Sequence, residues 1–171
     1  LTEGQANTVI GFEAANDLTT GDNNTVLGHQ AFDRATTAAL RNVAIGHQAM
    51  HGNFTTAAVV DCVAIGVNAL EATLTADASG TTAIGKAAGA AITSGQANVL
   101  IGHESGTAIT DGDYSTAVGY QTLKAQVKAG DTGNTAMGFK AGIAVTSGTY
   151  NVIVGRTAGF TANTMSGSVI I

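Results

Sequence analysis

The sequence predicts an all-β fold in which short coils stack into a parallel β-roll or β-solenoid. First, one eight-residue motif recurs nine times at spacings of 17–20 residues, which is typical of stacked repeat proteins. Second, a glycine lies in the middle of every apolar stretch and would cost about 1 kcal/mol per copy in a helix interior. Third, Thr, Val and Ile concentrate in the motif, and β-branched residues favour strands.

The motif divides the chain, residues 1–171, into a single domain of repeats. Copies begin near residues 7, 24, 42, 62, 81, 98, 115, 134 and 151, and a truncated tenth begins at 168. Typical copies are NTVIGFEA, NVAIGHQA and NVLIGHES. The motif glycines are Gly11, Gly28, Gly46, Gly66, Gly85, Gly102, Gly119, Gly138 and Gly155, and each is expected to form a bend at the end of a strand. At about 4.8 Å per coil, nine coils would form a rod about 40 Å long.

The linkers and the first motif position supply a second pattern. Short linkers of about nine residues carry one aliphatic residue (Leu18, Ile92, Ile109 or Val145), then Thr and a glycine turn. The recurrent Asn that opens the motif is expected to stack on its copies, because Asn ladders satisfy side-chain amides between layers. Its copies are Asn7, Asn24, Asn42, Asn98, Asn134 and Asn151.

The composition indicates a thin core. Ala, Thr and Gly make up nearly half of the chain, aromatic residues make up 5%, and Trp is absent. A coil so poor in large residues needs an outside surface on which to bury apolar area. We therefore expect a parallel homotrimer assembled through an apolar column of Val26, Ile45, Ile65, Ile84 and Ile101.

The NTVIG and NVAIG repeats resemble those of bacteriophage tail fibres and the head repeats of trimeric autotransporter adhesins, over essentially the whole chain. The resemblance implies homotrimeric parallel β-rolls in which the alternating Val/Thr and Ile positions pack inward while the coil edges face solvent. Adhesin heads usually repeat at a shorter spacing, so the longer repeats here look more like those of phage fibres. The implied location is extracellular or on a virion, with the bacterial outer surface as the alternative.

Several functions find no support in the residues. A net charge of −5 argues against nucleic acid binding, and no apolar run approaches the roughly 20 residues that cross a membrane. The acidic residues are scattered and no nucleophile motif is present, so we expect no catalytic site, no cofactor and no enzyme. Cys62 is expected to be a small buried hydrophobe. His29 and His47 lack further ligands at metal-binding spacing, and Asp111-Gly112-Asp113 suits a turn better than a calcium loop.

Two candidate binding surfaces remain. The residue after each motif glycine varies widely and is expected to form an outward column, which includes His29, His47 and Tyr120. Four linkers are longer than the rest, over residues 32–41, 50–61, 70–80 and 123–133, and extra residues should bulge outward from a coil of fixed circumference. These bulges are expected to display Phe32, Arg34, Arg41, His51, Asn53 and Phe54 to a receptor.

The sequence thus favours a rigid spacer in a phage tail fibre, with a glycan or protein receptor as its possible partner besides further copies of itself. A bacterial adhesin head is the first alternative. A monomeric solenoid that binds ice or a polysaccharide is the alternative from another class, although the threonines at the second motif position form only a broken column.

Overall fold

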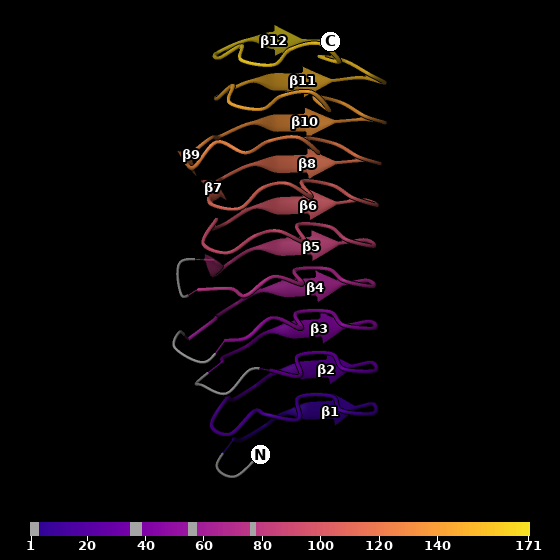
Figure 1. Ribbon diagram of the computed structural model, residues 1–171, viewed down its shortest axis with the longest axis vertical. Helices are drawn as coiled ribbons and strands as arrows, with labels where there is room; N and C mark the ends of the chain where they lie inside the picture. Colours follow the sequence, from indigo (N-terminus) through magenta and orange to yellow (C-terminus); the bar gives the residue numbers. More distant parts are fainter. Residues whose placement is uncertain (1–3, 35–38, 55–57, 76–77) are drawn as a thin grey trace.

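A computed structural model describes residues 4–34, 39–54, 58–75 and 78–171 of the chain. The described residues form a β-solenoid whose coils stack along one axis (Figure 1). Ten strands make one parallel sheet: β1 (Thr8–Ile10), β2 (Thr25–Leu27), β3 (Val43–Ile45), β4 (Val63–Ile65), β5 (Thr82–Ile84), β6 (Val99–Ile101), β8 (Thr116–Val118), β10 (Thr135–Met137), β11 (Val152–Val154) and β12 (Val169–Ile170). The predicted all-β stacked-coil fold is confirmed.

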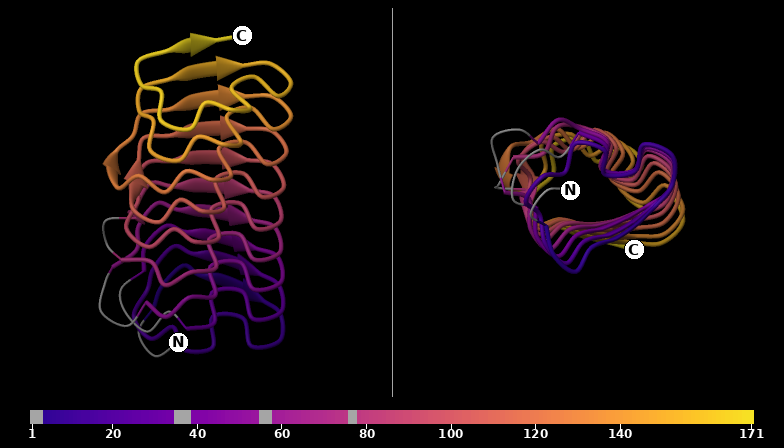
Figure 2. Two further views of the ribbon diagram at one scale, coloured as in Figure 1. Left: turned by 45° about the horizontal axis from the view of Figure 1, so that its top comes forward. Right: turned by 90° about the horizontal axis from the view of Figure 1, so that it is seen from below.

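The strands pair in perfect repeat register. Thr8 lies opposite Thr25, and Val63 lies opposite Thr82, so every motif position forms a continuous column along the rod. Viewed down the axis, the coils superimpose around one oblong outline (Figure 2). A second, two-stranded sheet of β7 (Gly112–Asp113) and β9 (Gly130–Asp131) lies beside the amino-terminal ends of the main strands (Figure 1).

The coil closes through corners of left-handed backbone. These corners fall at the second and fourth residues after the motif glycine and at the residue before the next motif, as at Gln48 (φ 54°), Met50 (φ 51°) and Asp61 (φ 59°). Most of these positions are not glycine, although left-handed backbone costs an L-residue about 1–2 kcal/mol. Backbone hydrogen bonds between neighbouring coils recur at these corners, for example from Gln48 N–H to His29 O at 3.0 Å, and offset that cost.

The motif glycines serve a different purpose from a simple bend. Each has φ between 130° and 143°, and all except Gly155 lie closely against the backbone of the next coil. A Cβ on Gly85 would stand 2.5 Å from the carbonyl oxygen of Gly102, closer than a methyl group can approach. The predicted structural requirement for these glycines therefore has a defined cause, which is contact between coils.

The middle residue of each strand points into the core, and its two neighbours point outward. Ala44, Ala64 and Leu100 are fully buried, whereas the first and third strand residues are half-buried or exposed. The expectation that the Val/Thr and Ile positions pack inward is therefore wrong. The interior holds a single layer of side chains, so a small middle residue leaves room for the linker aliphatics Leu18, Ile92, Ile109 and Val145, all of which are buried.

The apolar column expected for trimer contacts also needs one correction. Val26 is the buried middle residue of β2 and does not belong to the same column as Ile45. The residue in register with Ile45 is Leu27, which is exposed. The corrected outward column is Ile10, Leu27, Ile45, Ile65, Ile84, Ile101, Val118, Met137 and Val154.

Candidate interaction surface

An apolar sheet runs along one side of the rod without a covering layer. We call it the sheet face and define it by the first and third residues of β1 to β6, β8, β10 and β11. The third residues are all aliphatic or Met, and Ile10, Leu27 and Met137 are 44–59% exposed. The first residues are all either Thr or Val, and none of them is buried. A continuous apolar face of this length is typical of an interaction site.

The column after each motif glycine does point outward, as predicted. We call it the post-glycine column: Phe12, His29, His47, Val67, Lys86, His103, Tyr120, Phe139 and Arg156. All of its members are exposed except His103, which is half-buried. Its rings stack in two groups, with centroid distances of 5.4 Å for Phe12–His29, 5.1 Å for His29–His47, 5.2 Å for His103–Tyr120 and 5.3 Å for Tyr120–Phe139.

This stacking limits what the post-glycine column can bind. The ring faces of His29 and Tyr120 are turned toward their neighbours on both sides, so mainly their edges meet solvent. The Arg156 guanidinium lies 5.5 Å from the Phe139 ring centroid and covers its remaining face. The described residues contain no group of three or more His, Cys, Asp or Glu side chains that could hold a metal ion. We therefore interpret the column mainly as a stabilising ladder.

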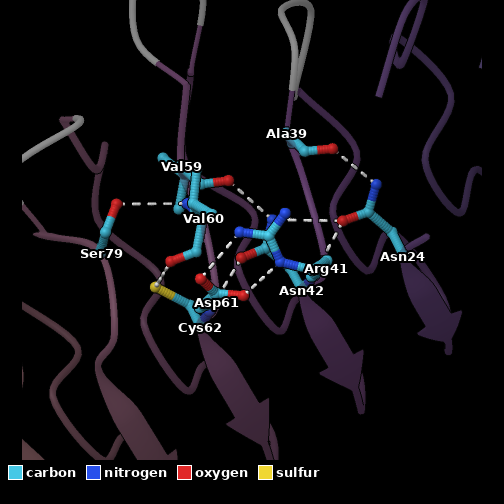
Figure 3. Close-up of polar contacts among 9 residues, drawn as sticks. All are labelled: Asn24, Ala39, Arg41, Asn42, Val59, Val60, Asp61, Cys62 and Ser79. Atoms are coloured by element: carbon cyan, nitrogen blue, oxygen red, sulfur yellow. Dashed lines mark hydrogen bonds and ion pairs between the residues drawn. The ribbon is translucent and has the colours of Figure 1, made fainter. Parts of the chain in front are cut away.

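The first motif positions form the predicted ladder inside the coil. The Asn42 side chain donates a hydrogen bond from Nδ2 to Asn24 Oδ1 at 3.2 Å, and the Asn42 backbone N–H donates to the same oxygen at 2.9 Å (Figure 3). Its Nδ2 also donates to Val59 O at 2.8 Å. The side chain is buried, so these bonds satisfy groups that water cannot reach. The structural reading of the Asn column is confirmed.

Cys62 occupies one position of this ladder. Its backbone N–H donates to Asn42 Oδ1 at 2.9 Å (Figure 3). Its thiol donates to Ala78 O at 3.4 Å. Burial raises the pKa of the Cys62 thiol, so the reactive thiolate is disfavoured. The expectation of a small buried residue is confirmed.

The proposed patch on the long linkers is only partly exposed. Phe32 and Phe54 are buried in the core with their ring centroids 5.7 Å apart, so the expectation that they face a receptor is wrong. These longer coils enclose more space, and the two rings fill it. Arg34 and Asn53 are exposed, and His51 is half-buried with Nε2 3.7 Å from Asp33 Oδ2.

The outward bulges can be followed in one of the four linkers. Residues 35–38, 55–57 and 76–77 of the other three lie outside the described residues. In the linker over 123–133, residues 127–131 are exposed and include β9, which stands out from the coil wall (Figure 2). The predicted turn at Asp111-Gly112-Asp113 instead contains β7, the partner of β9. Asp111 accepts hydrogen bonds from Thr93 Oγ1 and Ser94 Oγ at 2.7 and 2.8 Å, which lower the pKa of this carboxyl.

A third outward column was not recognised from the sequence. We call it the edge column, and it consists of the left-handed residue immediately before each ladder position: Ala6, Asn23, Arg41, Asp61, Gly80, Ala97, Tyr114, Gly133, Tyr150 and Gly167. All are exposed except the half-buried Gly133. Arg41 and Asp61 form an ion pair of 2.7 Å between adjacent coils (Figure 3). The motif alignment places these residues in register, but their side chains are of such different types that the sequence does not reveal them as one column.

Comparison with known proteins found no matching family model, no similar curated protein and no similar solved structure. Within the described part of the chain there is no enclosed pocket. The same residues include no helix that is long and apolar enough to span a membrane. The three outward surfaces are therefore the candidate sites of interaction.

Proposed function

We propose that this chain is a non-enzymatic structural segment of a homotrimeric extracellular fibre, in which it acts as a rigid spacer that can also present a receptor-binding surface. The observation that carries the proposal is the uncovered sheet face, which presents aliphatic side chains on every coil. A phage tail fibre is the favoured setting because of the repeat resemblance and repeat length.

The dimensions of the sheet face suit contact between copies. Nine strands about 4.8 Å apart and three residues of about 3.3 Å each give a projected area of roughly 430 Å². A standard interface uses about 800 Å² of accessible surface per partner, with an apolar centre and a polar rim. The sheet face supplies such a centre, and the post-glycine column supplies a polar rim along one of its edges. Because every coil presents the same pattern of residues, copies that pack in parallel bury equivalent sheet-face residues against one another.

Charge placed on the sheet face tests this function. We expect sedimentation of the unmodified chain to give a trimer, and we expect Ile65→Lys and Ile84→Lys to dissociate it, because each buries an unpaired ammonium group in the interface. Asn16→Lys is the matched control, since Asn16 is exposed outside the sheet face. A folded monomer for the unmodified chain, or trimers that survive both Ile substitutions, would overturn the proposal.

Two alternatives keep specific support. A bacterial adhesin head would use the same trimer, and the sequence flanking this segment distinguishes it through a membrane anchor or a virion-attachment domain. An ice-binding monomer would use the outward threonines Thr8, Thr25, Thr82, Thr116 and Thr135, which face solvent on the flat sheet. Val43, Val63 and Val99 interrupt that column. A monomer that inhibits ice recrystallisation would favour this alternative over the fibre.

A further inference from the structure

Tyr114 and Tyr150 differ from the other exposed aromatic side chains on the long columns. They are 50% and 57% exposed, and among the described residues no aromatic ring stacks on either of them. Tyr120, by contrast, is held between His103 and Phe139. Tyr114 and Tyr150 therefore offer ring surface to a ligand in a way that the stacked column does not.

The two tyrosines belong to the edge column, two coils apart. Tyr114 lies between β7 and β8, and Tyr150 directly precedes the ladder residue of β11, so both stand at the amino-terminal edge of the sheet (Figure 1). Two coil spacings correspond to about 10 Å along the rod axis. Gly133 occupies the coil between them and adds no side chain that would separate the two rings.

The packing around Gly133 sets the position of Tyr150. A Cβ on Gly133 would stand 2.8 Å from Tyr150 Cδ1, so the ring lies close over this glycine. The Tyr150 hydroxyl donates a hydrogen bond to the Asp131 carboxylate, which raises the pKa of Tyr150. One tyrosine is therefore preorganised by its neighbours, which reduces the entropy lost on binding.

The charges nearby determine which ligand suits these rings. Asp131 is exposed on β9, and Asp113 on the paired β7 accepts a hydrogen bond from Gln96 N–H at 2.9 Å. Lys128 is the one cationic side chain in the neighbouring bulge over residues 127–131. Carboxylates accept hydrogen bonds from hydroxyl groups but repel anions. The surface therefore favours a ligand that is rich in hydroxyl groups and uncharged.

We propose that Tyr114 and Tyr150 form a binding line for a neutral, extended polysaccharide that runs parallel to the rod axis. The electron-rich face of an aromatic ring attracts the weakly positive C–H groups of a pyranose. An extended β-linked pyranose chain advances per sugar by nearly one coil spacing, so alternate sugars meet the two rings. Asp113 and Asp131 accept hydroxyl hydrogen bonds beside them. The inference deepens the proposed function by naming a receptor class, and it rests on that function because the fibre must leave this edge exposed.

The test uses hexasaccharides of β-1,4-linked glucose and of β-1,4-linked N-acetylglucosamine, with an oligogalacturonate as the anionic comparison. The chain has no Trp, and two of its three Tyr form the proposed line, so a change in tyrosine fluorescence that Tyr120→Ser retains reports on that line, and calorimetry gives the affinity. We expect a neutral hexasaccharide to bind and the oligogalacturonate not to bind. The Tyr114→Ser/Tyr150→Ser variant should raise the dissociation constant by about tenfold or more, because two ring contacts are lost.

Matched variants make the outcome specific. Tyr120→Ser removes a stacked tyrosine and should leave the affinity unchanged, while Tyr114→Phe/Tyr150→Phe keeps both rings and should retain most of it. Circular dichroism confirms folding, and each single Ser variant replaces the double variant if the latter unfolds. Absence of neutral-glycan binding, a preference for the anionic oligomer, or undiminished binding by the Ser variants overturns the proposal. Sedimentation of the same samples reports on the trimer separately, so failure of the glycan proposal can be distinguished from failure of the trimer proposal.

Discussion

Replacing Gly85 with alanine tests whether contact between coils dictates the motif glycine. The backbone of Gly85 has φ +131°, and its N–H donates to Ile65 O at 2.7 Å. An added Cβ would stand 2.5 Å from the oxygen and 2.6 Å from the carbon of the Gly102 carbonyl, and 3.1 Å from His103 N. All three atoms are backbone atoms, and Gly102 N–H is itself bonded to Ile84 O at 2.7 Å. The neighbour cannot move away without weakening the sheet.

Two costs add at this position. A residue with a side chain at this φ costs about 1–3 kcal/mol in backbone conformation. Forcing two coils apart to admit the methyl group adds about 1–3 kcal/mol, as other overpacking substitutions do. We therefore expect Gly85→Ala to lower the free energy of unfolding by about 2–6 kcal/mol, and Gly85→Val by at least as much.

Gly80→Ala is the matched control. Gly80 also has a left-handed backbone (φ +75°), but a Cβ there would meet nothing within 4 Å, so only a conformational cost of about 1 kcal/mol remains. Thermal melting followed by circular dichroism should separate the two variants, since about 2 kcal/mol corresponds to about 4–8 °C for a chain of this length. Equal melting temperatures for Gly85→Ala and Gly80→Ala would refute the argument from coil contact.

Three further substitutions or modifications test the interior and its charges. Asn42→Ala should destabilise the fold by roughly 2–4 kcal/mol in urea unfolding, because it leaves the buried Cys62 N–H without its acceptor and removes one of the two hydrogen bonds to Val59 O, whereas the exposed Asn16→Ala should change little. The Cys62 thiol should react with iodoacetamide only when the chain unfolds; rapid alkylation under native conditions would contradict its burial. Burial, followed by the charge of Asp17, raises the pKa of Asp33, so ionisation of this carboxyl opposes folding. The stability that the protonated carboxyl contributes is complete below the pKa of the unfolded state and is lost as the pH rises through the pKa of the folded state. Asp33→Asn should therefore raise the melting temperature at pH 7 and have a smaller effect at pH 3; an equal effect at both would count against a charge origin.

The repeat period made much of the fold predictable. Parallel pairing in repeat register follows once the same residue types recur in every copy, since each coil meets the same neighbours. The Asn ladder could be predicted for the same reason, because an amide buried in one coil finds its partner in the next. Both features depend on contacts between equivalent residues of neighbouring repeats, and the repeat alignment identifies those residues directly.

The facing of the strands could not be predicted in the same way. In a three-residue strand, alternation allows either the middle residue or its two neighbours to face inward. The choice depends on the width of the interior, where Leu70 and Leu100 already occupy the space beside Ala64 and Ala83. The burial of Phe32 could not be predicted either, because the ring that packs against it, Phe54, comes from another coil and from a linker of different length.

Both ladders of the rod are interrupted at the fourth and fifth coils, and the interior ladder is interrupted again by Ser115 in the seventh. In the fourth and fifth motif copies, the interior ladder carries Cys62 and Thr81 instead of Asn, and the post-glycine column carries Val67 and Lys86 instead of rings. The ladder contact there is long, since Asn98 N–H lies 3.4 Å from Thr81 Oγ1, against 2.9 Å between Asn42 N–H and Asn24 Oδ1.

The sheet remains continuous across this interruption, with Val63 opposite Thr82 and Ile65 opposite Ile84. The outward column of the sheet face is uniformly Ile over the four central coils, from Ile45 to Ile101, and changes to Leu, Val or Met on either side. Contacts between neighbouring repeats set the local stability of a solenoid. The stability of the central coils therefore depends on the sheet more than that of the flanking coils does. If copies pack on the sheet face as proposed, the most regular part of that interface coincides with the coils whose own ladders are weakest. Assembly would then stabilise the rod where a single chain is least able to do so.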